Sequence, residues 1–569
     1  MYTLEKLKRN FLPIDLEINW ESIEPFYKNL LERNIDTKES LEKWLQDRSE
    51  LEAVLEEDYA WRYIRMTCDT MDENHQQAFE YFATQIDPKV SELSNKLNDK
   101  FLNSTYLNSL DQTKYGIYIR SLKTQFEIFR EANIPIQMEL QLEQQKFGAI
   151  AGAMTIEHDG KEFTLEQASN FLKSTNRSLR KEIYEKIQSR RLQDKVQLDE
   201  LFNKLISMRN QVAINANFNN YRDYMFKALG RFDYTAEDCF EFHNAIEKEV
   251  VPVLKSIYEK RKQELKIDAL KPYDTEVDTS GKQAIQPFNG AEELIDKSIE
   301  AFSKLHPYFG EKLKTMKLNQ LIDLESRKGK APGGYNYPLS ESGAPFIFMN
   351  SANSMRDLTT MVHEGGHAIH TFLSNHLELN DFKRIPSEVA EVASMSMELI
   401  SMKTWDVFFN NADDLKRAKE EQLKDCLKTL PWVATIDAFQ HWLYTHPEHS
   451  TEERTKAWLE CYDRFGAGFV DWTGYESYKE NLWQKQLHLF EVPFYYIEYA
   501  IAQLAAIAIY KNFKENESKA LEQYIEALKL GYTKSIPEIY KTAGIEFNFS
   551  ADYIHTLVNF IKEELDSLN

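Results

Sequence analysis

Helix-breaking residues are scarce along this chain. Its 569 residues include 19 glycines and 16 prolines, about 6% of the total against the roughly 12% of an average soluble protein. From about residue 15 to residue 270, apolar residues recur at spacings of three and four with charged residues between them. The sequence therefore predicts a mainly α protein, built as a large multi-helix body.

Three segments depart from helical periodicity. Residues 154–164 alternate apolar and polar side chains around an Asp-Gly pair, which is the sequence of a type I′ hairpin. Residues 266–290 concentrate turn-forming residues and predict a long loop. Within residues 326–350, two β-prone runs at 335–339 and 345–350 flank a Ser/Glu/Gly turn, which predicts a small β-hairpin in the helical protein.

The acidic balance of the chain limits its partners. It carries 69 Lys and Arg against 91 Asp and Glu, a formal net charge of -22, and such a surface repels nucleic acid and acidic membrane faces. The most apolar stretch, residues 493–510, is interrupted by Glu498 and Gln503 and predicts a buried helix instead of a membrane span. We expect neither nucleic acid nor a membrane as a partner.

The N-terminus and the cysteines indicate the location of the protein. Residues 1–18 alternate charged and apolar side chains and lack the apolar core of a secretory signal. The four cysteines, Cys68, Cys239, Cys426 and Cys461, lie far apart without a C-x-x-C pair. This spacing argues against a disulfide framework and a zinc knuckle, and a reducing cytoplasm fits it best.

The motif HEGGH carries the strongest chemical signal. His363 and His367 are four positions apart, so on a helix both imidazoles reach one zinc ion, and Glu364 lies beside the metal. A chain of this composition contains some H-[DE]-x-x-H by chance roughly 5% of the time. The residues around the motif therefore have to show whether it is a metal site or a chance match.

The surroundings favour a helix at about residues 355–376. Ser354 and Asp357 have the spacing of a capping box at its start. The adjacent Gly365 and Gly366 cost about 1 kcal/mol each against alanine in the middle of a helix. That penalty is explained if another group approaches the helix closely.

A catalytic zinc ion takes three protein ligands and keeps one position open, so a third ligand is required. A second helix is predicted after Ser387 as its N-cap, with Glu388, Glu391 and Glu398 on one face. We choose Glu391 as the ligand because the small residues around it allow the two helices to touch. Glu398 is better placed to accept a hydrogen bond from a ligand imidazole. The residues thus predict one zinc ion (Zn2+) per chain.

His370 and Glu388 stay open as alternative ligands. His370 shares the helix face of the two motif histidines, although a lone histidine is more often structural. Metzincin peptidases require glycine at position 370 and histidine at position 373, whereas this chain has His370 and Leu373. That class of metallopeptidase is excluded.

Four features together resemble one family of zinc oligopeptidases, which includes oligoendopeptidase F, Pz-peptidase and thimet oligopeptidase. They are RKGKAPGGY from Arg327, FIFMN from Phe346, HEGGHAIH from His363, and a glutamate 24 residues after His367. The resemblance is strongest from about residue 327 to residue 503. In helical pattern and length it extends over the whole chain.

The resemblance implies that His363, His367 and Glu391 bind zinc and that Glu364 is the catalytic base. It also implies a nearly all-helical body split by a deep central channel, with the small β element next to the active site. Substrates of such a site are short, unstructured peptides.

The family further carries a histidine and tyrosines near its C-terminal end, and the matching stretch here begins at His488. By this resemblance we assign His488, Tyr496 and Tyr499 to the catalytic site, as donors to the developing oxyanion. Tyr495 is the alternative tyrosine. The tyrosine-rich run is more like that of oligoendopeptidase F than that of thimet oligopeptidase.

The leading hypothesis is a cytoplasmic zinc endopeptidase, with residues 1–160 as an N-terminal helical region and residues 161–569 as the catalytic region. The edge of the predicted hairpin, residues 335–350, offers main-chain hydrogen bonds to an extended peptide. Two alternatives stay open: a related gluzincin with exopeptidase or dipeptidase preference, and a non-catalytic helical scaffold that binds peptides and has a degenerate metal site. Nothing in the sequence fixes the oligomeric state.

Overall fold

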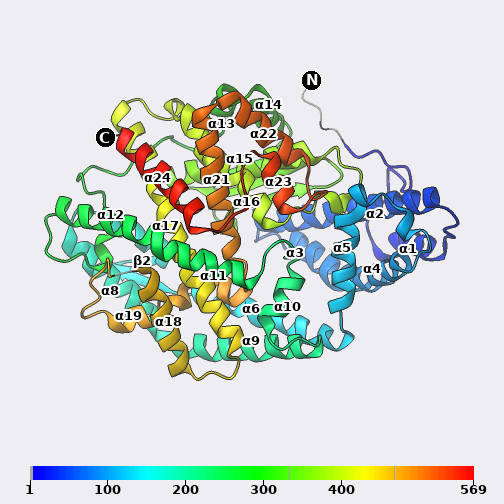
Figure 1. Ribbon diagram of the computed structural model, residues 1–569, viewed down its shortest axis with the longest axis horizontal. Coiled ribbons are helices and arrows are strands. Elements are labelled where there is room, and N and C mark those ends of the chain that lie inside the picture. Colours follow the sequence, from blue (N-terminus) through cyan, green and yellow to red (C-terminus); the bar gives the residue numbers. More distant parts are fainter. Residues whose placement is uncertain (1–3, 5, 332, 467, 569) are drawn as a thin grey trace. The chain divides into compact units, whose positions relative to one another are not determined.

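Helices dominate the computed structural model of this chain, which describes residue 4 and residues 6–331, 333–466 and 468–568 (Figure 1). This confirms the predicted mainly α fold class. The chain divides into two units, each assembled from three segments. Unit 1 comprises Met1–Glu127, Ile285–Lys419 and Ala505–Phe547, and unit 2 comprises Ile128–Ala284, Glu420–Leu504 and Asn548–Asn569.

Unit 1 contains the N-terminal helices, a small sheet and the helices around the HEGGH motif. Its helices are α1 (Trp20–Glu32), α2 (Lys38–Cys68), α3 (Glu73–Tyr81), α4 (Asp87–Leu102), α5 (Gln112–Ile128), α13 (Ala291–Leu305), α14 (Pro307–Leu318), α15 (Met355–Ser374), α16 (Ser387–Ile400), α22 (Glu517–Lys529) and α23 (Ile536–Thr542). Its strands are β3 (Ile322–Glu325), β4 (Tyr335–Leu339) and β5 (Ala344–Ser351).

Unit 2 is built from helices and one hairpin. Its helices are α6 (Ile134–Gly152), α7 (Leu165–Ser169), α8 (Arg177–Gln193), α9 (Lys195–Asn215), α10 (Tyr221–Ala228), α11 (Ala236–Ala245), α12 (Val251–Glu264), α18 (Thr451–Gly466), α19 (Glu476–Glu480), α20 (Leu487–Glu491) and α24 (Ala551–Leu568). The hairpin strands are β1 (Thr155–His158) and β2 (Lys161–Thr164). Helices α17 (Ala412–Thr445) and α21 (Ile497–Glu515) each run from one unit into the other.

Short turns of 3-10 or π helix join or extend these elements. They are η1 (Phe82–Ile86), η2 (Leu107–Ser109), η3 (Glu131–Asn133), η4 (Asn170–Lys173), η5 (Ile246–Val250), η6 (Pro272–Asp274), η7 (Asn380–Lys383), η8 (Ser401–Val407) and η9 (Leu482–Lys485).

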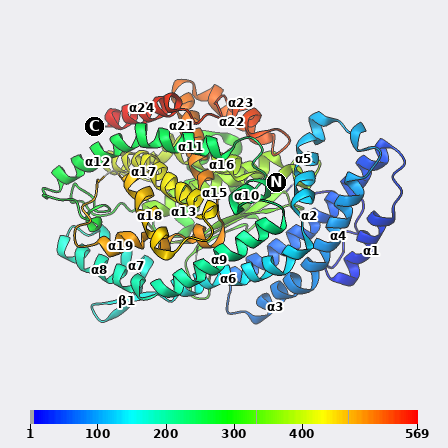
Figure 2. The same ribbon diagram turned by 60° about the horizontal axis from the view of Figure 1, so that its bottom comes forward.

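The first helices of unit 1 begin at capping boxes and share one core. Asn19 exchanges hydrogen bonds with Ser22 at the start of α1, and Thr37 does the same with Ser40 at the start of α2. The apolar faces of α1, α2, α4 and α5 bury a common cluster of aromatic and aliphatic side chains. In Figure 2 α1, α2 and α4 are the blue helices that lie side by side.

The predicted hairpin at residues 154–164 is confirmed as β1 and β2. The strands pair antiparallel, with Ile156 opposite Phe163. Asp159 and Gly160 form the turn with φ of 51° and 70°, the positive values that a type I′ turn requires at both positions. The predicted long loop is also confirmed, because η6 is the one helical turn described between α12 and α13.

The three-stranded sheet of unit 1 has the order β3-β5-β4. β4 and β5 pair antiparallel and confirm the predicted hairpin. β3 pairs parallel with β5, and this strand was not predicted. Its four residues carry too short a pattern to be recognised, and its pairing depends on a segment more than twenty positions away along the chain.

α15 and α16 pack against each other and carry the motif and the glutamate stripe. α15 was predicted at about residues 355–376 and extends from Met355 to Ser374. The prediction of Ser387 as the N-cap of α16 is wrong. Pro386 occupies the cap with extended backbone (φ -63°, ψ 146°) and no side-chain cap bond, and Ser387 is the first helical residue.

Unit 2 buries a large aromatic core in which α6, α9, α18 and α20 take part. Phe147 and Phe490 stack there with ring centroids 4.3 Å apart. None of the helices in the described ranges is both long and apolar enough to cross a membrane. The predicted boundary between residues 160 and 161, and the predicted deep channel, stay predictions.

Candidate metal centre

The HEGGH motif lies in α15, whose start is fixed by the predicted capping pair. The backbone N–H of Asp357 donates to Ser354 Oγ, and the backbone N–H of Ser354 donates to Asp357 Oδ2 at 2.8 Å. The helix then places both motif histidines on the side that meets α16. The two helices are labelled α15 and α16 in Figure 1. Local sequence therefore sets the register of the motif.

Two close approaches explain the paired glycines of the motif. A Cβ at Gly366 would lie 2.6 Å from the carbonyl oxygen of Ala393 and 2.6 Å from Cα of Ser394, both on α16. A Cβ at Gly365 would lie 2.7 Å from the ring of Phe302 on α13. The expectation that other groups approach the helix closely at these glycines is confirmed.

The side chains of His363, His367 and Glu391 converge within unit 1. Their ligand atoms, two imidazole nitrogens and a carboxylate oxygen, all lie within 4.8 Å of one another. Nε2 of His363 lies 3.4 Å, and Nε2 of His367 3.8 Å, from Oε2 of Glu391. Two nitrogens and one oxygen are a donor set of catalytic zinc sites, so the three residues fit a zinc ion.

The charges of this trio also suit a cation. Burial would raise the pKa of the Glu391 carboxyl, but His363, His367 and Ser394 outweigh it and lower the pKa to about 2. Burial lowers the pKa of His367 to about 4. Burial alone would lower the pKa of His363. The hydrogen bonds of the imidazole to Glu391 and Glu398 outweigh burial and raise this pKa well above the usual value. That proton occupies the place that a bound cation takes.

Glu398 fixes the orientation of the His363 ring. Its Oε1 lies 2.7 Å from Nδ1 of His363, which leaves Nε2 of that imidazole directed toward Glu391. Carboxylates commonly orient metal-binding histidines in this way. The structure thus brings Glu398 to the position that the sequence analysis assigned to it.

Glu364 is buried beside the histidines. It is 7% exposed, and burial, together with the carboxylates Glu391 and Glu398, raises the pKa of its carboxyl to about 7. Nδ2 of Asn336 donates to the backbone carbonyl of Glu364 at 3.1 Å. Asn336 lies on β4, so this hydrogen bond holds the strand against the motif. Asn336 was not predicted from the sequence, because no local signal connects it with the motif.

The alternative ligands lie outside the converging trio. His370 is 2% exposed, and burial lowers its pKa to about 3. Glu388 is also buried, and its backbone carbonyl accepts a hydrogen bond from the Tyr540 hydroxyl at 2.9 Å. The three residues whose ligand atoms converge do not include either of them.

His488 and the predicted tyrosines cluster within unit 2. The ring of His488 lies 4.8 Å from that of Tyr496, 5.8 Å from that of Tyr499 and 6.1 Å from that of Tyr495, between centroids. Nδ1 of His488 lies 2.8 Å from Nε2 of Gln486. The structure therefore brings the three assigned residues and the alternative Tyr495 together, and the roles assigned to them stay predictions.

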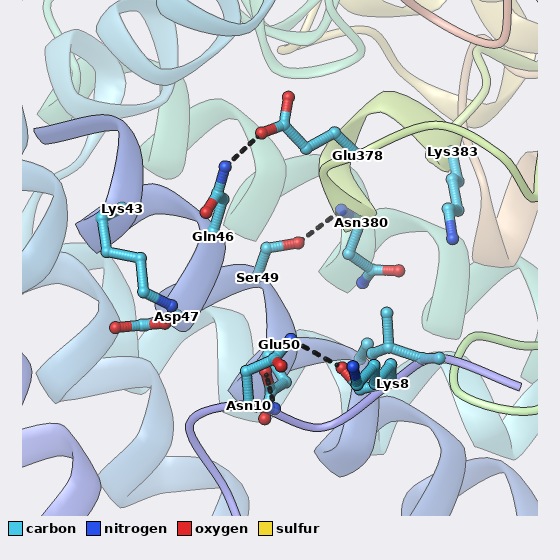
Figure 3. A pocket seen from close by; sticks show the side chains of 12 residues that line it. Lys8, Asn10, Lys43, Gln46, Asp47, Ser49, Glu50, Glu378, Asn380 and Lys383 are labelled. Carbon is cyan, nitrogen blue, oxygen red and sulfur yellow. Dashed lines mark hydrogen bonds and ion pairs between the residues drawn. The ribbon is translucent and has the colours of Figure 1, made fainter. Parts of the chain in front are cut away.

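Unit 1 also contains a pocket that is lined by other residues. It measures about 160 Å³ and is lined by α2, the N-terminal segment and the segment that follows α15 (Figure 3). Its polar groups are bonded to one another: Glu50 accepts the backbone N–H of Asn10, and Ser49 accepts that of Asn380. The residues that line it do not include any member of the HEGGH centre.

Comparison with models of protein families matches residues 170–558 to "Peptidase family M3" and residues 14–129 to the "Peptidase M3 N-terminal domain". Oligopeptidase PepF of Bacillus subtilis is 25% identical over 442 residues, which are 72% of this chain and 61% of PepF. The oligoendopeptidase F homolog of Borreliella burgdorferi is 27% identical over 337 residues, 58% of this chain and 55% of that protein. The matched region thus spans less than two thirds of the length of these relatives.

Solved structures match over nearly the whole chain. Pz peptidase A with an inhibitor gives a TM-score of 0.89 at 26% identity, and the match covers 98% of both chains. A structure assigned to oligoendopeptidase F gives a TM-score of 0.89 at 25% identity, over 98% of this chain and 99% of the other.

Proposed function

This chain belongs to peptidase family M3, as its resemblance predicted, and we propose that it is a zinc-dependent endopeptidase that hydrolyses short, unstructured peptides. The proposal is carried by one observation, the convergence of His363, His367 and Glu391 on ligand atoms within 4.8 Å of one another. A gluzincin with exopeptidase preference and a non-catalytic scaffold are the alternatives.

We assign one zinc ion to this centre, held by His363, His367 and Glu391. When bound, zinc supplies a Lewis acid that polarises a peptide carbonyl and makes a neighbouring water more acidic. Glu398 accepts the Nδ1–H of His363 and keeps the ring from turning.

Glu364 acts as the general base and then as the general acid. Its carboxylate takes a proton from the attacking water and passes it to the leaving amine. Its burial excludes competing solvent, and its backbone is fixed by the hydrogen bond from Asn336. A carboxylate held in this way needs little reorganisation at the moment of reaction.

The outer edge of β4 supports the binding of an extended peptide. Pro338 lies opposite Pro345, and neither has an N–H, so this position does not form a hydrogen-bonded pair. Two positions earlier, Asn336 lies opposite Ile347, whose N–H is directed to Leu321 at 2.9 Å on the other side of the sheet.

The backbone N–H and C=O of Asn336 therefore point away from β5 by the alternation of an antiparallel pair. A peptide that adds to this edge pairs with main-chain groups, which recognise backbone and little sequence. The same residue bonds to the carbonyl of Glu364, so the edge and the base are connected by one side chain.

For His488, Tyr496 and Tyr499 we propose hydrogen-bond donation to the oxyanion that develops on the scissile carbonyl. Their clustering within unit 2 and the family resemblance support this role. We also propose a cytoplasmic location, because the four cysteines, two of them buried, are not joined in disulfides, which suits a reducing compartment.

The proposal is tested by separating metal binding from chemistry. Glu364→Gln keeps the size of the side chain but does not accept the proton, so we expect it to retain zinc and to lose at least about a hundredfold in turnover. His363→Ala is the matched variant that loses the metal. Zinc content by elemental analysis and cleavage of an internally quenched peptide are the two measurements.

The outcomes distinguish the alternatives. Turnover of Glu364→Gln within about tenfold of the wild type excludes Glu364 as the base. Release of single residues or dipeptides from one end of the substrate favours an exopeptidase. A wild-type protein that binds peptides and zinc without any cleavage is a scaffold.

A further inference from the structure

In unit 2, helix α11 and the part of α17 that belongs to this unit each present two metal-binding residue types four positions apart. The two pairs are Cys239 and His243 on α11, and Asp437 and His441 on α17. Residues four apart lie on the same face of a helix. The two faces meet, because Nε2 of His243 lies 2.9 Å from Oδ2 of Asp437.

The four side chains are sealed from solvent. Cys239 and His243 are each 2% exposed, Asp437 is 0% exposed and His441 is 4% exposed. Aromatic rings surround His441, among them Phe240 with its centroid 4.8 Å away. Solvent therefore does not reach the polar atoms of this cluster.

Three of these buried atoms have no hydrogen-bond partner among the residues that the structure describes. They are both ring nitrogens of His441 and Oδ1 of Asp437; Nε2 of His441 lies 3.3 Å from Oδ2 of Asp437 without hydrogen-bond geometry. The great majority of buried polar atoms are bonded, and an unbonded one is costly in an apolar environment. A bound cation would take up one ring nitrogen of His441 and a carboxylate oxygen of Asp437.

We propose that Cys239, Asp437 and His441 bind a second zinc ion, which ties α11 to α17. Their ligand atoms, a thiol sulfur, a carboxylate oxygen and an imidazole nitrogen, lie within 4.8 Å of one another. His243 orients Asp437 through its hydrogen bond. A thiolate and a carboxylate neutralise a divalent cation, so the occupied site carries no net buried charge.

The chemistry of this site differs from that of the HEGGH centre. When zinc binds, the S–H bond of Cys239 breaks, its proton goes to solvent, and a bond between sulfur and zinc forms. Burial raises the pKa of the thiol well above its usual value, so the thiol stays protonated until a cation replaces the proton. Sulfur and nitrogen ligands favour zinc over magnesium or calcium.

The sulfur ligand provides the test. The protein is produced in cells supplied with cobalt in place of zinc, so that the cation is present while the chain folds. We expect two cobalt ions per chain and a sulfur-to-cobalt charge-transfer band in the near ultraviolet, which a site of nitrogen and oxygen ligands does not produce. Absence of that band from the wild-type protein overturns the proposal.

Two serine variants assign the band to one sulfur. Cys239→Ser is expected to abolish the band and to release about one ion per chain. Cys426→Ser is the matched control, because Cys426 lies on α17 and is likewise 2% exposed; it should keep the band and both ions. A band that survives in Cys239→Ser, or that disappears in Cys426→Ser, overturns the assignment. If Cys239→Ser does not fold, the wild-type spectrum and ion count still decide.

His363→Ala separates this site from the proposed peptidase centre. We expect the variant to lose one ion and to retain the band. If only the peptidase centre fails to bind metal, the wild type shows one ion with the band. If only the second site fails, it shows one ion without the band.

Discussion

Oε1 of Glu398 lies 2.7 Å from Nδ1 of His363, and the two residues are on different helices of unit 1. The contact joins α16 to α15 at the motif and leaves Nε2 of His363 directed toward Glu391. A single carboxylate thus orients the ring of His363 and also connects the two helices that carry the proposed ligands. Its removal has a measurable consequence that differs from removal of a ligand.

We expect Glu398→Gln to weaken zinc binding at the HEGGH centre by about tenfold to a hundredfold, because the ring of His363 loses the acceptor that orients it. The variant should still bind zinc at high free metal, whereas Glu391→Ala should not. Competition against a chelator of known affinity measures the difference. Glu388→Gln is the control on the same helix, and a comparable loss there would identify Glu388 as a ligand instead.

Gly366→Ala should destabilise unit 1 and weaken metal binding together. The added methyl would meet the backbone of α16 at Ala393 and Ser394, 2.6 Å away, so the helix that carries Glu391 has to move. Overpacking of this kind costs about 1–3 kcal/mol. Thermal unfolding with and without a chelator, followed by zinc competition, measures both effects.

A series of glycines tests that explanation. Gly365→Ala should cost less than Gly366→Ala, because its methyl would meet the end of the Phe302 side chain, whereas the methyl at Gly366 would meet backbone atoms of α16. Gly148→Ala in α6 has no neighbour within 4 Å and should stabilise the protein by up to about 1 kcal/mol through helix propensity. Equal losses of stability at all three positions would contradict the explanation that close contact with neighbouring helices requires glycine at positions 365 and 366.

The lowered pKa of Asp323 predicts that the stability of the protein depends on pH. Burial would raise the pKa of its carboxyl, but Arg327 and Lys330, each 2.7 Å away, lower it to about 2. A lowered pKa gives stability that is complete above the unfolded value of about 3.9 and is lost as the pH falls toward 2. Asp323→Asn should therefore cost about 1–2 kcal/mol near neutral pH, and this difference should shrink between about pH 4 and pH 2.

Unfolding of both proteins across this pH range measures the difference. Asp296→Asn is the control: Asp296 pairs with Lys317 at 2.6 Å, but its side chain is 65% exposed, and a surface pair of this kind contributes little. If the difference in the free energy of unfolding between Asp323→Asn and the wild type stayed constant from neutral pH to pH 2, the ion pair would be ruled out as its cause.

Local signals explain what the sequence predicted well. The helix of the HEGGH motif follows from a capping pair and from histidines four positions apart, and the hairpin turn follows from Asp159 and Gly160. All of these are encoded within a few residues. Glu391 was reached because a catalytic zinc requires a third ligand and the next helix carries a glutamate stripe.

Features that depend on distant contacts were missed. β3 is four residues long and becomes a strand by pairing with β5. Asn336 has no motif around it, and its role arises because the fold brings β4 to the carbonyl of Glu364. The cluster at Cys239 had a signal, a cysteine and a histidine four apart and an aspartate and a histidine four apart. Neither pair has the C-x-x-C spacing of a zinc knuckle, and the two helices that carry them are far apart in the sequence.

The last prediction concerns the folded state of the substrate. Glu364 and Glu391 are each 7% exposed, and the edge of β4 offers pairing to a backbone whose hydrogen-bonding groups are free. A folded domain uses those groups internally, and its unfolding costs about 5–15 kcal/mol, which a peptidase without an energy source does not supply. We therefore expect efficient cleavage of a peptide of about ten residues and no cleavage of the same sequence within a stable folded domain.

A destabilised variant of that domain, with an unchanged cleavage sequence, is the matched control. Its cleavage should rise in proportion to the fraction that is unfolded, because the enzyme acts on the open form. Mass spectrometry of the fragments gives the rate and the position of the cut. Cleavage of the stable domain at the rate of the free peptide would show that the recessed centre does not select for unfolded chains, while the zinc site itself would still stand.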